Sequence, residues 1–127
     1  MKHLIIGVDL GGTYVKTAIA SRDRKILGKD SRPTFAEQGP EKVMDVMTES
    51  VDAVLHMAGA GREDVLAAGF GAPGPMNWQT GVVYNPPNLP GWHNVPLAKL
   101  MKERLGFPCY VDNDANVACY GEYWNGA

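Results

Sequence analysis

Hydrophobic and polar positions alternate in short runs over the first third of the chain, a pattern typical of β-strands. The run LIIGVDL, residues 4–10, is rich in β-branched side chains and ends at Gly-Gly, so it predicts a buried strand. Two more runs, at 13–20 and 25–32, are separated by a polar turn and predict two further strands. Strands joined by such short turns predict an antiparallel start to the sheet.

The hydrophobic period lengthens to about four residues after Pro40. Between Pro40 and about Met57 the apolar side chains recur every fourth position, at Val43, Met47, Val51 and Leu55. This spacing predicts an amphipathic helix, since such residues share one helical face. Proline suits the first turn of that helix, and Gly59 suits its end.

Strand and helix patterns alternate in the second half of the chain. We expect a buried strand in DVLAAGFGAP at 64–73, a helix at 96–106, a strand at 107–113 and a final helix from Asp114 to Trp124. The segment 71–96 reads as one long loop with little regular structure, and loops of that length are usually functional. The predicted fold class is therefore α/β. Its mixed sheet has three antiparallel strands, then parallel strands flanked by helices.

The composition fits one ordinary globular domain. The chain has 127 residues, of which 45% are hydrophobic and 20% charged, with a net charge of -2. Because there is no basic run, we expect neither nucleic acid nor an anionic membrane as a partner. No signal-like or membrane-spanning stretch is present, and Cys109 and Cys119 fit no metal spacing, so we expect a cytoplasmic protein with reduced thiols.

The first candidate site lies where the first strand runs into Gly-Gly. Glycines at 11 and 12 let backbone amides approach a phosphate, and the Thr13 hydroxyl can add a donor. Asp9 could hold Mg²⁺, and Lys16 is near enough to add positive charge. An ordinary hairpin turn is the alternative interpretation. The segment is not a P-loop, because the required lysine motif and a following helix are both missing.

Residues 69–74, GFGAPG, match the glycine pattern of a dinucleotide-binding loop. Such a loop must open a helix, whereas Pro73 and Pro75 interrupt this one and the sequence continues as a loop. We therefore reject a dinucleotide site here. A tight loop beside a ligand fits the residues better.

Residues 112–116, DNDAN, crowd two aspartates and two asparagines between a strand and a helix. One helix cap needs only one such side chain, and both Asn113 and Asp114 are good caps. A ligand site at the carboxyl end of a parallel strand is the alternative. A carboxylate at a helix N-terminus stays ionised, so it could accept a proton from a hydroxyl. Both interpretations stay open on these residues alone.

The proline-rich loop NPPNLPGW, residues 85–92, is the last candidate. Asn88 offers both a donor and an acceptor, which suits a sugar hydroxyl, and Trp92 could shield a pocket. A rigid structural loop with Trp92 in the core is the alternative interpretation.

Four segments together resemble the ROK family (repressors, open reading frames, kinases): DLGGTYVK, GFGAPGPMN, GVVYNPPNLPGW and VDNDANVACYGEYWNGA. They occur in the family's order, cover nearly the whole chain and are most similar to its bacterial glucokinase members. The resemblance implies that residues 1–127 form the N-terminal lobe of an actin-like, ribonuclease H-like ATPase fold, with the second lobe absent. It also implies a homodimer in the complete protein.

The resemblance also implies roles for individual residues. The phosphate-binding motif would comprise Asp9, Gly11, Gly12, Thr13 and Lys16. Asp114 matches the catalytic base, and Asn113 matches a neighbouring sugar ligand. Gly74 and Asn88 fall in loops that line the sugar site, while Asp112 and Asn116 are expected to brace it.

The implied activity is ATP- and Mg²⁺-dependent phosphorylation of a hexose, with glucose favoured, at its 6-hydroxyl. Fructose, mannose, N-acetylmannosamine and N-acetylglucosamine remain alternatives. We expect the 127-residue chain alone to be inactive, and a structural zinc only if a second lobe carries the family's cysteine motif. A non-catalytic sugar-binding or sugar-sensing domain is the rival function. A DNA-binding repressor is disfavoured, because only eight residues precede Asp9.

Overall fold

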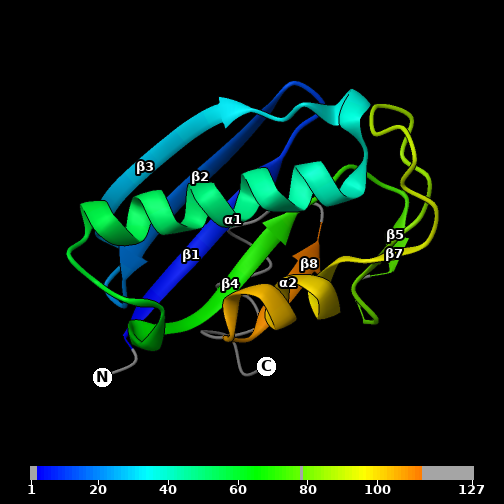
Figure 1. Ribbon diagram of the computed structural model, residues 1–127. Coiled ribbons are helices and arrows are strands. Elements are labelled where there is room, and N and C mark those ends of the chain that lie inside the picture. Colours follow the sequence, from blue (N-terminus) through cyan, green and yellow to red (C-terminus); the bar gives the residue numbers. More distant parts are fainter. Residues whose placement is uncertain (1–2, 78, 113–127) are drawn as a thin grey trace.

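The computed structural model describes residues 3–77 and 79–112, and Figure 1 shows its arrangement. The chain starts with three consecutive strands, β1 (Leu4–Leu10), β2 (Tyr14–Ser21) and β3 (Ile26–Pro33). β1 pairs with β2, and β2 with β3, both antiparallel. The predicted antiparallel start is therefore confirmed, with strand bounds within one residue of the expected ones.

Two later strands extend the sheet on the other side of β1. β4 (Val65–Gly71) pairs parallel with β1, and β8 (Cys109–Asp112) pairs parallel with β4. The five-stranded sheet thus has the order β3-β2-β1-β4-β8. This is the mixed sheet that the alternation of strands and helices predicts.

Two helices cover one face of this sheet (Figure 1). α1 (Pro40–Met57) packs mainly across β2 and β3, while α2 (Leu97–Leu105) packs against β8. Short 3₁₀ turns, η1 (Ala36–Gln38) and η2 (Arg62–Asp64), flank α1 in the chain. No helix within the described ranges is long and apolar enough to cross a bilayer. The predicted helix from Asp114 to Trp124 lies outside the described residues.

The segment 71–96 is more regular than the sequence suggests. It contains three two-residue strands, β5 (Met76–Asn77), β6 (Val82–Val83) and β7 (Val95–Pro96), which form a small antiparallel sheet. Val83 and Val95 lie opposite each other and are both buried. The expectation of little regular structure holds for most of the segment. The small sheet itself was not predicted, because two-residue strands are too short to show a hydrophobic period.

Alternate residues of β1 and the apolar stripe of α1 form the centre of the core. On β1 the alternate positions that face α1 are at most 2% exposed: Leu4, Ile6, Val8 and Leu10. On α1 the residues spaced by four are at most 3% exposed: Val43, Met47, Val51 and Leu55. Burying a side chain of this kind contributes about 1.5–3 kcal/mol, so the burial of these residues holds α1 on the sheet.

A polar network crosses the same helix–sheet interface. Ser50 Oγ of α1 lies 2.7 Å from both Thr17 Oγ1 and Asp30 Oδ2. The serine hydroxyl has one hydrogen to donate, and a carboxylate only accepts. Ser50 therefore donates to Asp30 and accepts a hydrogen bond from the Thr17 hydroxyl. Arg32 donates to both carboxylate oxygens of Asp30, at 2.7 and 3.1 Å. Every member of the network therefore has a partner, and the network aligns α1 with β2 and β3.

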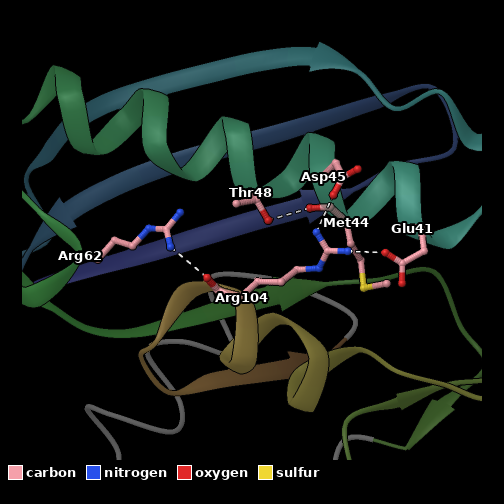
Figure 2. Close-up of polar contacts among 6 residues, drawn as sticks. All are labelled: Glu41, Met44, Asp45, Thr48, Arg62 and Arg104. Carbon is pink, nitrogen blue, oxygen red and sulfur yellow. Dashed lines mark hydrogen bonds and ion pairs between the residues drawn. The ribbon is translucent and has the colours of Figure 1, made fainter.

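Arginines connect the two helices at the surface (Figure 2). Arg104 of α2 donates to Asp45 and Glu41 of α1, each at 2.6 Å. Arg62 donates to the main-chain oxygen of Arg104 at 2.9 Å. It also pairs with Asp52 of α1. Glu41 is 83% exposed, so its ion pair contributes at most about 1 kcal/mol. The contacts to α2 matter chiefly because α2 leads directly into β8.

We predict that Asp30→Asn lowers the free energy of unfolding by about 1–3 kcal/mol at pH 7, since it weakens charge-assisted hydrogen bonds in a part-buried site. The hydrogen bond from Arg32, and then that from Ser50, lowers the pKa of Asp30 against the effect of burial. A carboxyl with a lowered folded-state pKa stabilises the fold above its unfolded pKa of about 4, and this contribution is lost as the pH falls through the folded value.

Urea unfolding of both proteins between pH 7 and pH 3 measures this difference, which should shrink below about pH 4. Asp52→Asn is the control, because Asp52 pairs with Arg62 but is 48% exposed and should cost less. A difference between wild type and Asp30→Asn that is the same at both ends of the pH range would contradict the role of the Asp30 carboxylate.

Candidate active site

The turn between β1 and β2 is a closed hairpin turn. The Gly11 amide donates to the Tyr14 oxygen at 3.0 Å, which confirms the hairpin interpretation for the backbone. A Cβ at position 11 would lie 2.8 Å from the same oxygen, so this turn requires glycine there. The amides of Gly12 and Thr13 donate no hydrogen bond to any residue the structure describes. A hairpin turn and an anion-binding turn are therefore compatible in this segment.

Gly12 lies in contact with Asn88, which brings two of the predicted site segments together. A Cβ built on Gly12 would lie 2.9 Å from the Asn88 Cβ and 3.3 Å from the Asn88 oxygen. Real Cβ atoms essentially never approach that closely, so position 12 must be glycine for Asn88 to sit where it does. The need for Gly12 thus comes from a neighbour in space, in addition to any ligand.

Buried side chains hold the Asn88 loop in place. Asn88 itself is exposed, whereas Leu89 and Trp92 are 0% exposed and belong to the core. The Leu89 amide donates to the Pro86 oxygen at 3.2 Å, which closes a turn around Asn88. The structure therefore favours the core interpretation of Trp92 over a pocket shield, and it presents Asn88 on a loop anchored in the core.

The strand register places polar residues from distant segments in one row across the sheet. Lys16 of β2 is the partner of Asp9 of β1, Asp9 is the partner of Gly71 of β4, and Gly71 is the partner of Asp112 of β8. Asp9 faces away from α1, because its neighbours along β1 face the core under that helix. Two strand spacings separate Asp9 from Asp112, or about 10 Å. Gly71 puts no side chain between the two carboxylates.

The remaining predicted site residues include Gly74, Asn113 and Asp114. Gly74 is exposed and follows the end of β4, and no hydrogen bond among the described residues links it to Gly12 or Asn88. Asn113 and Asp114 lie outside the described residues. After Gly71 the chain enters β5 and not a helix, which agrees with the rejection of a dinucleotide site at 69–74.

The acidic side chains fit a magnesium ion only together with other ligands. Within residues 3–77 and 79–112, no three His, Cys, Asp or Glu side chains gather in a metal-binding group. Asp9 is a single exposed carboxylate. Mg²⁺ is commonly held by one or two carboxylates with substrate phosphates and water, so Asp9 fits that arrangement and not a dedicated protein cage.

Thr34 is a residue of the site that sequence reasoning missed. It is 0% exposed and follows β3 directly. Its hydroxyl donates to the Gly11 oxygen at 2.8 Å, and its amide donates to the Thr13 oxygen at 2.9 Å. A lone threonine after a strand carries no local pattern, so no signal in the sequence could have identified it.

Comparison with known proteins identifies the family. The profile of the ROK family matches residues 5–127. The chain belongs to the ROK family. A glucokinase from Thermotoga maritima is 40% identical over 126 residues, which is 99% of this chain and 38% of the relative. A putative xylose repressor from a Caldicellulosiruptor species is 31% identical over 123 residues, which is 97% of this chain and 31% of the relative.

Solved ROK structures agree with the fold. A ROK family glucokinase from Streptomyces griseus, in complex with glucose and AMPPNP, superposes with a TM-score of 0.78 at 34% identity. The match covers 98% of this chain and 37% of that one. The chain therefore has the actin-like ATPase fold of ROK sugar kinases, as the four sequence segments imply. It spans less than two fifths of the length of these proteins.

We predict that Gly12→Ala forces Asn88 out of its position. The added methyl group would lie 2.9 Å from the Asn88 Cβ, so crowding should cost about 1–3 kcal/mol in the free energy of unfolding. It should also move the Asn88 side-chain amide signals in a nitrogen–proton correlation spectrum. Gly28→Ala is the matched control, since its new Cβ would crowd the Met57 Cβ at 3.0 Å, away from Asn88. Unmoved Asn88 signals in folded Gly12→Ala would contradict the contact.

Proposed function

We propose that the protein is an ATP-dependent hexose kinase, with glucose as the favoured sugar. The observation that carries this proposal is the contact of Gly12 with Asn88. It sets a turn with two available amides against a loop whose exposed amide side chain suits a sugar hydroxyl. Phosphoryl transfer depends mainly on holding the two reactants in line, and this contact supports the proposal because it joins the two segments proposed to bind them. Membership of the ROK family and the glucokinase relatives support the same activity.

Asp114 is the proposed catalytic base, with Asn113 binding the sugar beside it. Asp114 comes two positions after Asp112, which ends β8 in the same sheet row as Asp9. In this proposal the Asp114 carboxylate would accept the proton of the sugar 6-hydroxyl as that oxygen bonds to the γ-phosphorus of ATP. The bond from that phosphorus to the β-phosphate oxygen breaks, and ADP leaves.

The phosphate-binding role falls to the β1–β2 turn and its flanks. The Gly12 and Thr13 amides can donate to phosphate oxygens, and Lys16 adds a positive charge on the same face of the sheet as Asp9. Asp9 would hold Mg²⁺ through water or directly, and the ion would neutralise phosphate charge. Gly74 is assigned to the sugar side, at the end of β4.

In this proposal the chain is the N-terminal lobe of the enzyme and supplies the base and half of the ligand contacts. Because it spans less than two fifths of its relatives, we do not expect turnover from these 127 residues alone. A dimeric, cytoplasmic complete protein is part of the same proposal. A structural zinc ion would belong to a second lobe.

Sugar sensing without catalysis is the second candidate function. The putative xylose repressor of Caldicellulosiruptor, 31% identical to the chain, supports it. Such a domain needs the Asn88 side of the site but has no use for a catalytic base. The two functions therefore differ in what Asp114 does.

ADP release by the complete protein, measured with Mg-ATP and with or without glucose, tests the proposal. A kinase releases ADP only when its sugar is present. Asp114→Asn is the matched variant, since it removes the base but keeps the size and hydrogen-bonding ability of the side chain. We expect at least about a hundredfold loss of kcat, because a positioned base contributes at least that factor, while glucose affinity is retained.

Two outcomes would count against this function. Folded complete protein that binds glucose without releasing ADP would favour the sensor. Full turnover by Asp114→Asn would return Asp114 to a helix-capping role.

A further inference from the structure

Thr34 holds the β1–β2 turn from behind. Although it is polar, it is 0% exposed, and its hydroxyl and its backbone amide both donate to the turn. The hydroxyl donates to the Gly11 oxygen at 2.8 Å and the amide to the Thr13 oxygen at 2.9 Å. The two bonds grip the carbonyls on either side of Gly12.

The geometry of the peptide group transmits this grip to the Gly12 amide. A trans peptide is planar, with its C=O and N–H pointing in opposite directions. The Gly11 oxygen and the Gly12 nitrogen belong to one such plane. Because Thr34 holds that oxygen, the Gly12 N–H must point away from Thr34. This is one of the two amides that donate to no described residue.

Phe35, which follows Thr34, has a strained backbone conformation. Phe35 has φ 56° and ψ 44°, a left-handed conformation that bulky residues rarely adopt. Its side chain is 41% exposed, with the Lys42 Nζ 5.3 Å from the ring centre, so the core does not hold this ring. The two hydrogen bonds of Thr34 therefore hold the chain next to a residue whose backbone conformation its own side chain does not favour. Strain of this kind is commonly found beside ligand-binding segments.

We propose that Thr34 is a positioning residue for the triphosphate, and that its hydroxyl aims the Gly12 amide at a phosphate oxygen. The inference rests on the proposed function for the identity of the ligand. It adds a residue from outside the glycine turn, contributed by the end of β3. Thr34 does not itself touch the ligand.

Equilibrium binding to the complete protein tests this, with Mg-AMPPNP, AMP and glucose as probes. Thr34→Val keeps the shape and the backbone amide but removes the hydroxyl. We expect it to weaken Mg-AMPPNP binding by about three- to tenfold, the effect of one hydrogen bond. AMP, which lacks the β- and γ-phosphates, and glucose should bind as to wild type. Thr34→Ser should restore Mg-AMPPNP affinity, because it restores the donor.

Thr17→Val is the matched control. Thr17 is 3% exposed and shares a hydrogen bond with Ser50 under α1. Thr17→Val therefore also removes a buried threonine hydroxyl, but one that lies away from the turn. It should lower stability and leave Mg-AMPPNP affinity unchanged. An equal loss of affinity in Thr17→Val and Thr34→Val would overturn the proposal, as would unchanged affinity in Thr34→Val.

The wild-type protein gives a second test should Thr34→Val fail to fold. The Gly12 amide signal must shift on adding Mg-AMPPNP and stay in place with AMP. A Gly12 signal that stays in place with Mg-AMPPNP, or one that shifts with AMP, would overturn the proposal. A protein that turns over glucose while Thr34→Val binds Mg-AMPPNP normally refutes only the role of Thr34. A protein that depends on Thr34 for Mg-AMPPNP but releases no ADP refutes only the kinase. Wild type without any Mg-AMPPNP binding refutes both.

Discussion

The close approach of Gly12 to Asn88 is the constraint on which the candidate site depends. A side chain at position 12 would start 2.9 Å from the Asn88 Cβ, so only glycine lets the two segments meet. This contact joins a hairpin turn of the main sheet to a loop that Leu89 and Trp92 anchor in the core. Each segment alone is an ordinary structural element. Together they place a set of available amides beside an exposed asparagine.

The rest of the fold keeps this meeting point in place. The apolar stripe of α1 and the Ser50–Asp30–Arg32 network fix β2 and β3 against the helix. Thr34 at the end of β3 then reaches back to the β1–β2 turn. On the other side, Arg104 and Arg62 tie α2 to α1 and η2, and α2 leads into β8 (Figure 2). Both edges of the sheet are thus held by contacts that involve neither Gly12 nor Asn88.

Regular elements could be predicted from the sequence, because their hydrophobic periods are local. The four-residue spacing from Val43 to Leu55 led directly to α1, and the alternation in residues 4–33 led to three strands. The turn has no room for a side chain at Gly11 or Gly12, while the phosphate-binding role of these glycines stays a prediction. The reason for Gly12 could not be predicted, since the side chain that requires it comes from a loop far along the chain. Thr34 was missed because its bond to Gly11 joins residues 23 positions apart. The roles of Asn113 and Asp114 stay predictions.

A crystal structure of the complete protein with glucose and AMPPNP would test the central claim most directly, namely that the turn and the Asn88 loop form one site for both ligands. The account predicts a phosphate oxygen within hydrogen-bonding distance of the Gly12 amide, and a glucose hydroxyl within the same range of the Asn88 side chain. Either ligand bound away from its segment would contradict it.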